Sequence, residues 1–174
     1  LSSVVHSLAH APNLKTNSLL ETTRDDYLRA HEISAYSLID TTRQVRRFLD
    51  EDMDTPTRSI TALSYLGATR AIPGYNVMGP AKASLESIVR GLASETAPSI
   101  RVNAVSAGPL PTLSARGGIA DFAEMRKEMD ERAPLGNITA DQVASTVQFL
   151  ASNEGSGITG QTVYVDGGYS IVGG

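Results

Sequence analysis

The residues best suited to chemistry are two tyrosines and a lysine, Tyr65, Tyr75 and Lys82, in the run SYLGATRAIPGYNVMGPAK. A tyrosine hydroxyl can stabilise or protonate the oxyanion that forms when hydride adds to a polarised double bond. A lysine beside it can hold a sugar hydroxyl and favour the tyrosinate through its positive charge. Neither side chain can supply hydride, so the pattern indicates an oxidoreductase with a redox cofactor.

The spacing of these residues does not fix the orientation of the Tyr75 side chain relative to Lys82. Tyr75 and Lys82 are seven residues apart, which in a helix returns to nearly the same face two turns along. Pro80 lies between them and is comfortable only in a first helical turn, so a helix starting at residues 77–79 would leave Tyr75 just before it. Taken alone, a Tyr and a Lys at this spacing are more often a core edge and a solvated charge than a catalytic pair.

Short segments with Val or Ile, bounded by turn residues, predict four strands at Ser3–Ser7, Ser59–Ser64, Ile100–Ser106 and Gln161–Val165. Helical spacing of apolar residues predicts one long helix or two abutting helices over Thr22–Leu49, and a helix over Ala81–Thr96 that Pro98 stops. Thr139 and Gln142 form a capping-box pattern ahead of another helix. The alternation favours an α/β fold with a doubly wound parallel sheet.

Composition restricts the class of protein. A chain of 174 residues with 41% hydrophobic content fits one domain over 1–174. The net charge of -4, with both signs spread along the chain, excludes the basic stripe that nucleic acid requires. No apolar run approaches the ~20 residues that cross a bilayer, and the chain has no cysteine for a disulfide or a thiolate metal site.

The stretch 109–136 differs in character from the rest. It opens with Pro, Gly, Thr and Ser, continues with the charged amphipathic segment Phe122–Arg132 and ends at Pro134-Leu135-Gly136. We expect a substrate-binding lid here, and an ordinary surface helix between loops is the alternative. His6 and His10 are four residues apart, but no third ligand type clusters with them, so no metal site is expected.

The order of these motifs resembles the enoyl-acyl-carrier-protein reductases of the NADH type, a divergent branch of the short-chain dehydrogenase/reductase family. Standard members of that family carry Tyr-x-x-x-Lys, whereas the residue four before Lys82 is Met78. The wider Tyr-x6-Lys interval with a second Tyr upstream is the pattern of the enoyl reductase branch. Further segments that match in order are His6–Pro12, Arg101–Pro109, Ile158–Gln161 and Val165–Gly168.

The resemblance implies roles for individual residues. Tyr75 would stabilise the enolate, Lys82 would bind the ribose hydroxyls of NADH/NAD, and Tyr65 would line the site near the substrate. Ala11 would touch substrate. The remaining cofactor contacts would come from Leu8, Leu110, Pro111, Thr112, Leu113 and Ser114.

The resemblance also implies a Rossmann-like fold and NADH-dependent reduction of the trans-2 double bond of enoyl thioesters on acyl carrier protein, a step of fatty acid biosynthesis. It implies a homotetramer, and a location in the bacterial cytoplasm or in the plastid of a eukaryote. Two alternatives stay open. One is a short-chain reductase acting on a ketone, and the other is a non-catalytic truncated relative that serves as an oligomer partner or a dinucleotide-sensing subunit.

The resemblance covers only the later part of the family's domain. The chain opens at Leu1 within an expected strand, and no Gly-rich turn between a strand and a helix is found near its start. In a doubly wound fold that turn receives the pyrophosphate. We therefore expect that the first strands, and any targeting segment, lie upstream of Leu1, and that affinity for free dinucleotide is weak. The residue that selects NADH or NADPH normally follows the second strand of the whole domain, so that choice is not predicted.

Overall fold

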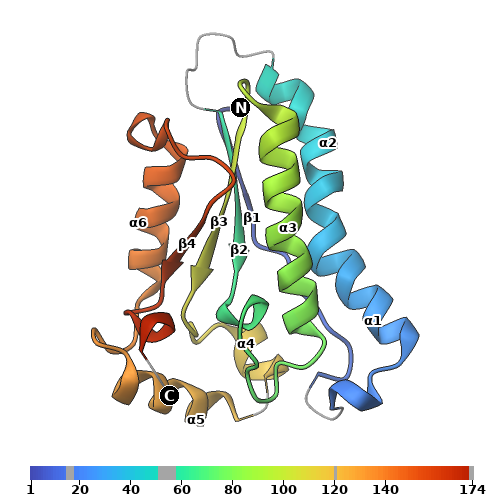
Figure 1. The fold of residues 1–174 in the computed structure, drawn as a ribbon, viewed down its shortest axis with the longest axis vertical. Helices are drawn as coiled ribbons and strands as arrows, with labels where there is room; N and C mark the ends of the chain where they lie inside the picture. Colours follow the sequence, from blue (N-terminus) through green and yellow to red (C-terminus); the bar gives the residue numbers. More distant parts are fainter. Residues whose placement is uncertain (15–17, 51–57, 120, 173–174) are drawn as a thin grey trace.

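The computed structural model describes residues 1–14, 18–50, 58–119 and 121–172, and its frame is a parallel sheet (Figure 1). Four strands pair in the order β1-β2-β3-β4, all of them parallel. The carboxyl ends of the strands therefore meet at one edge, which is where a doubly wound fold binds its ligands. The strands are β1 (Ser3–His6), β2 (Ser59–Ser64), β3 (Arg101–Ala107) and β4 (Thr162–Val165).

Helices cover both faces of this sheet. α3 (Met78–Thr96) packs on β2 and β3, with α2 (Ser37–Asp50) beside it, and α6 (Ala140–Ala151) packs on the opposite face (Figure 1). The doubly wound prediction is thereby confirmed. The chain between β3 and α6 forms α4 (Leu113–Gly118) and α5 (Phe122–Arg132), which lie at the carboxyl ends of the strands. The short 3-10 helices are η1 (Leu19–Glu21), η3 (Leu66–Ala68), η4 (Asn153–Gly155) and η5 (Tyr169–Ile171).

The central strands are buried on both faces, as expected where helices cover a parallel sheet. Ile60 and Ala62 of β2 belong to the core that the sheet forms with α2 and α3. Leu63, which points to the other face, packs in the core formed with α6 around Val105 and Leu150. Because successive side chains of a strand alternate between faces, β2 joins the two cores.

The predicted helix over Thr22–Leu49 is a continuous helical segment with an irregular middle. α1 (Arg24–His31) begins after Thr23, whose side chain accepts a hydrogen bond from the Asp26 amide. It runs into η2 (Glu32–Tyr36), a single π-helical turn, and then into α2. Such turns insert an extra residue into a helix and often occur at functional sites, and nothing in the apolar spacing signalled this one.

The other boundaries differ slightly from the sequence prediction. α3 begins at Met78 rather than at Ala81, which places Pro80 in the first turn, where its missing amide proton costs no helical hydrogen bond. Each strand end falls within one residue of its predicted position. The capping box of Thr139 and Gln142 is confirmed at the start of α6.

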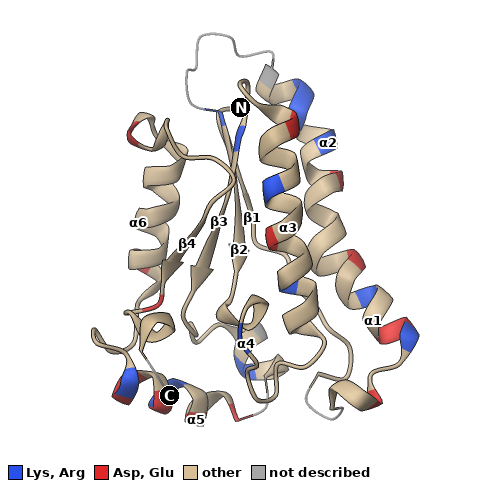
Figure 2. Cartoon of the chain, in the orientation of Figure 1, with Lys and Arg blue, Asp and Glu red and all other residues tan. Residues whose placement is uncertain are grey.

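Charged residues of both signs intersperse along α1, α2 and α5, whereas the strands carry few of them (Figure 2). Among the described helices, none combines the length and the apolar character that a bilayer crossing demands. The charged helices thus enclose an apolar sheet.

Candidate active site

Tyr65 and Tyr75 meet at the carboxyl end of β2. Tyr65 directly follows the strand, and Tyr75 lies after a turn in which Gly74 has a φ of 71°. Their ring centroids are 4.7 Å apart and the ring planes cross at 65°, an edge-to-face contact. The Tyr75 ring also lies directly on Gly67, where a Cβ would overlap it. The glycine is therefore part of the reason that the two phenols come together.

A cavity opens on each side of this tyrosine pair. Tyr65 lines one of about 350 Å³, whose wall includes the apolar residues Ile72, Pro109, Met125 and Met129. Tyr75 lines another of about 770 Å³, formed by the loop after β1, the start of α3 and the residues of α4. The smaller cavity is also lined by charged residues of α5, among them Glu124, Glu128 and Arg132, whereas the larger is lined mainly by small and apolar residues.

The buried surroundings keep both phenols protonated. Desolvation raises the pKa of Tyr75, which is 7% exposed, and Tyr65 adds to this effect. Desolvation likewise raises the pKa of Tyr65, with contributions from Tyr169 and Glu128. At neutral pH both groups are hydrogen-bond donors rather than bases. The Tyr65 hydroxyl already donates to Met125 Sδ over 3.4 Å.

Lys82 lies beneath the end of β2. Its side chain is 5% exposed, and Nζ donates a hydrogen bond to the Leu63 carbonyl over 2.7 Å. Burial lowers the pKa of Lys82 to about 8, an effect that the carboxylate of Glu86 opposes. Lys82 is not among the described residues that line either cavity.

The loop after β1 is tied to the π-helical turn. Ser34 Oγ accepts a hydrogen bond from the His10 amide over 2.9 Å and donates one to the His10 carbonyl over 3.0 Å. Ser37 Oγ donates to the Ile33 carbonyl over 2.6 Å, so His6 Nε2, 2.8 Å away, is the donor to Ser37. Burial and the charge of Lys82 lower the pKa of His6, in keeping with a neutral ring. The π-helical turn thus holds the wall of the larger cavity.

The structure brings together four of the residues that the sequence predicted. Ala11 and Thr112 line the larger cavity with Tyr75, and Tyr65 touches Tyr75 from the other cavity. Thr112 also caps α4 by accepting a hydrogen bond from the Ala115 amide over 3.1 Å.

The other predicted cofactor contacts are more dispersed. Leu8 is exposed in the loop whose neighbouring residues line the larger cavity. Leu110 packs against the core under α6, and Pro111 lines a third cavity of about 520 Å³. Leu113 is 91% exposed, and the side chain of Ser114 lies outside the described part of the chain.

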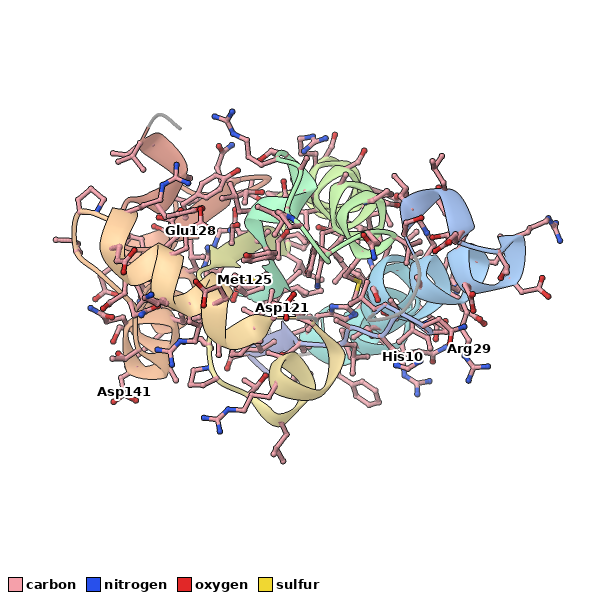
Figure 3. The ribbon with its side chains drawn as sticks, turned by 90° about the horizontal axis from the view of Figure 1, so that it is seen from below. His10, Arg29, Asp121, Met125, Glu128 and Asp141 are labelled. Carbon is pink, nitrogen blue, oxygen red and sulfur yellow. The ribbon has the colours of Figure 1, made fainter. Side chains whose placement is uncertain are left out.

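Sequence reasoning missed the rim that closes the smaller cavity. Glu128 accepts hydrogen bonds from the Tyr169 hydroxyl over 3.2 Å and from Arg132 over 2.6 Å. The Arg132 guanidinium also lies 5.3 Å from the centroid of the Tyr169 ring. Figure 3 shows Met125 and Glu128 on α5 and Asp121 at its start. The i, i+4 spacing of Glu128 and Arg132 was the available signal.

Proteins named as enoyl reductases match this chain in sequence and in fold. The family model described as enoyl-(acyl carrier protein) reductase matches residues 1–170. The enoyl-[acyl-carrier-protein] reductase [NADH] FabI of Neisseria meningitidis is 47% identical over 175 residues, which cover 98% of this chain and 65% of that protein.

Solved structures agree with the sequence comparison. The crystal structure of enoyl-[acyl-carrier-protein] reductase (NADH) from Aquifex aeolicus matches with a TM-score of 0.92 and 41% identity, covering 100% of this chain and 67% of that one. The Bacillus cereus enoyl-acyl carrier protein reductase with NADP+ and indole naphthyridinone matches with a TM-score of 0.89 and 42% identity, covering 99% and 66%.

The match is with only part of the relatives. This chain spans 65% of the length of the Neisseria protein, and it aligns along nearly all of its own length. The tyrosine pair, the parallel sheet and the matched residues lead to one assignment: the chain belongs to the enoyl-(acyl carrier protein) reductase family.

Proposed function

We propose that the protein carries the catalytic part of an NADH-dependent enoyl reductase that acts on trans-2-enoyl thioesters of acyl carrier protein. The observation that carries this proposal is the contact between Tyr65 and Tyr75, two protonated phenols that each line a cavity. The larger cavity is big enough for a flat cofactor ring and its ribose. Family membership and the names of the relatives support it.

The larger cavity suits the nicotinamide half of a dinucleotide. Its volume of about 770 Å³ lies within the usual range of cofactor pockets, and small residues and loop backbone line it. Thr112 and the loop around Leu8 would contact the cofactor there. The bound NADH would supply hydride to the β-carbon of the enoyl group.

Lys82 retains donors for the ribose. An ammonium group has three N–H donors, and the Leu63 carbonyl accepts only one of them. The other two remain for ribose hydroxyls. Since burial lowers the pKa of Lys82 to about 8, the group is still mostly charged at neutral pH.

The role of Tyr75 follows from its protonation. Burial raises the pKa of its phenol, so Tyr75 is a hydrogen-bond donor to the thioester oxygen as negative charge develops there. A fixed donor in a buried site needs little rearrangement during the reaction. Tyr65 lies on the substrate side, with its hydroxyl held by Met125.

The smaller cavity suits an acyl chain. Ile72, Pro109 and Met129 form apolar parts of its wall, although charged residues of α5 also line it. Burying a methylene group contributes about 0.8 kcal/mol. The lid over 109–136, apart from Ala120, which lies outside the described residues, forms α4 and α5. We propose that this lid closes over the chain and excludes water.

An assay with two substrates tests the proposal. A form of the protein that covers the full length of its relatives, and the Tyr75→Phe variant of that form, would each be supplied with NADH and with either a 2-enoyl or a 3-oxoacyl thioester of acyl carrier protein. NADH oxidation would be followed. We expect oxidation only with the enoyl substrate and only with intact Tyr75. A preference for the 3-oxoacyl substrate would favour the ketone reductase, and dinucleotide binding without turnover would favour the non-catalytic subunit.

We also propose that the protein assembles as a homotetramer through α1, α2 and α3. Tyr27, Leu28, Tyr36 and Phe48 are exposed along the segment from α1 to α2, and exposed apolar residues on one element are a common mark of an interface. Sedimentation velocity measures the state directly. A monomer at micromolar concentration would reject this part of the proposal.

A further inference from the structure

Two residues in one turn of α3 form hydrogen bonds with two successive residues of β2. Lys82 donates to the Leu63 carbonyl over 2.7 Å, and Ser64 Oγ donates to Glu86 Oε1 over 2.5 Å. Lys82 and Glu86 are four residues apart, so they lie on one face of the helix. Leu63 and Ser64 immediately precede Tyr65. The two hydrogen bonds therefore fix the end of the strand from which Tyr65 projects.

Glu86 is an unexpected residue in this place. It is 6% exposed, and its helix neighbours Leu85 and Val89 are fully buried in the main core. A buried carboxylate costs free energy unless it is paired and hydrogen-bonded. A glutamine could accept the same hydrogen bond from Ser64 at a smaller desolvation cost. The hydrogen bond alone thus does not account for the charge.

The negative charge of Glu86 acts on the positively charged Lys82. Glu86 is the group whose charge favours the ammonium form of Lys82 against burial. Burial raises the pKa of Glu86, while Ser64, Arg90 and Lys82 oppose that shift. On the neighbouring strand, His6 is disfavoured in its charged form by Lys82. Among the described residues these are the groups that act on the pair.

We propose that Glu86 is a positioning residue of the candidate active site, which holds the end of β2 through Ser64 and keeps the buried Lys82 ammonium charged for the ribose of the dinucleotide. Only the identity of that ligand rests on the proposed function. The geometry of Lys82, Ser64 and Glu86 is independent of it.

The titration of Lys82 tests the proposal without turnover. The chain has three lysines, Lys15, Lys82 and Lys127, so the signals of ¹³Cε-labelled lysine can be assigned with two Lys→Arg variants. Glu86→Gln keeps an acceptor for Ser64 and removes the charge. We expect it to lower the pKa of Lys82 by about one unit. Ser64→Ala removes the hydrogen bond and keeps the charge, so Lys82 should titrate within a few tenths of a unit of the wild type.

Dinucleotide binding gives a second readout. The dissociation constant of Glu86→Gln for NADH, measured by titration, should exceed that of the wild type about twofold at pH 7 and nearly tenfold at pH 9, and the two should agree at about pH 6. An unchanged Lys82 titration in Glu86→Gln overturns the proposal. If a wild-type form that covers the full length of the relatives fails to bind NADH, the proposed function fails, and the lysine titration still decides the role of Glu86.

Matched variants separate these effects from general damage. Glu95→Gln and Ser87→Ala change exposed residues of the same helix and should leave the Lys82 titration unchanged. If Glu86→Gln does not fold, Glu86→Asp serves in its place, because it keeps the charge and shortens the reach to Ser64. It should retain a charged Lys82, and a Lys82 signal that titrates well below that of the wild type would contradict the proposal.

Discussion

The two walls of the candidate site are built differently. One wall is formed by Tyr65 and by the buried residues Tyr75, Lys82 and Glu86, with two hydrogen bonds to the end of β2 and a glycine contact under Tyr75. The other wall is α5, which reaches the first through the contact of Met125 with Tyr65 and is held at its rim by Glu128 and Tyr169. The proposed chemistry thus lies on the first wall, which we call the firm wall, and we expect the second, the adaptable wall, to adjust to substrate.

The largest effect is expected from removing the hydroxyl oxygen of Tyr75. Tyr75→Phe keeps the ring on Gly67 and removes the proposed donor to the developing oxyanion. We expect kcat to fall about 10²- to 10³-fold, with little change in the dissociation constant for NADH. Steady-state kinetics and NADH titration measure the two effects. Tyr164→Phe, at an exposed position of β4, is the control, and equal losses in both variants would contradict the assignment.

A methyl group at Gly67 would disturb the packing of the same wall. Gly67→Ala places a Cβ against the Tyr75 ring, and relief requires a shift of that ring or of the chain. We expect a loss of about 1–3 kcal/mol in the free energy of unfolding, measured by urea denaturation. Gly91→Ala in α3 meets nothing within 4 Å and should gain roughly 0.5–1 kcal/mol. Equal stabilities of the two variants would show that the ring contact contributes nothing.

The pH dependence of dinucleotide binding tests the charge on the firm wall. Lys82 holds its proton below about pH 8 and loses it as the pH rises through that value, because burial lowers its pKa to about 8. The dissociation constant should stay level below this pH and rise roughly tenfold per unit above it. Both tyrosines keep their protons across this range. Titrations of NADH against the chain at several pH values measure the curve, and a flat curve would exclude a charged Lys82 from binding.

The smallest effects are expected at the rim of the adaptable wall. Tyr169→Phe removes the hydrogen bond to Glu128 and keeps the ring beneath Arg132. Because this contact is exposed, its loss should cost about 0.5 kcal/mol in the free energy of unfolding. KM for the enoyl thioester should change more than kcat. A large fall in kcat would show that Tyr169 takes part in the reaction, and it would contradict the proposed difference between the two walls.

Sequence patterns were sufficient for the strands and helices that carry the candidate site. The Val- and Ile-containing strands, the capping box at Thr139 and the segment from Tyr65 to Lys82 all report local preferences that the fold respects. The π-helical turn escaped prediction because its apolar spacing remains nearly helical. The contact of Tyr65 with Tyr75 depends on Gly67, a relation between side chains that spacing does not encode.

The adaptable wall and the charges were harder to predict. Glu86 lies in an otherwise apolar stripe, and only the structure shows that Ser64 is its partner. Lys82 was expected to face a cofactor pocket, whereas its ammonium group bonds to the Leu63 carbonyl. Whether it also reaches a ribose stays a prediction. Leu113 and Pro111 lie on exposed backbone, where no packing constrains the direction of a side chain.

The extra residue in η2 makes the length of this helix matter more than its composition. A π-helical turn takes one residue more than an α-helical turn, so deleting one residue from 32–36 would leave a regular α-helical turn there. The two hydrogen bonds between Ser34 Oγ and the backbone of His10 depend on the present turn and would be lost. Substitutions on the exposed surface of this helix should therefore be tolerated, whereas shortening it by one residue would change the wall of the larger cavity, which Tyr75 also lines.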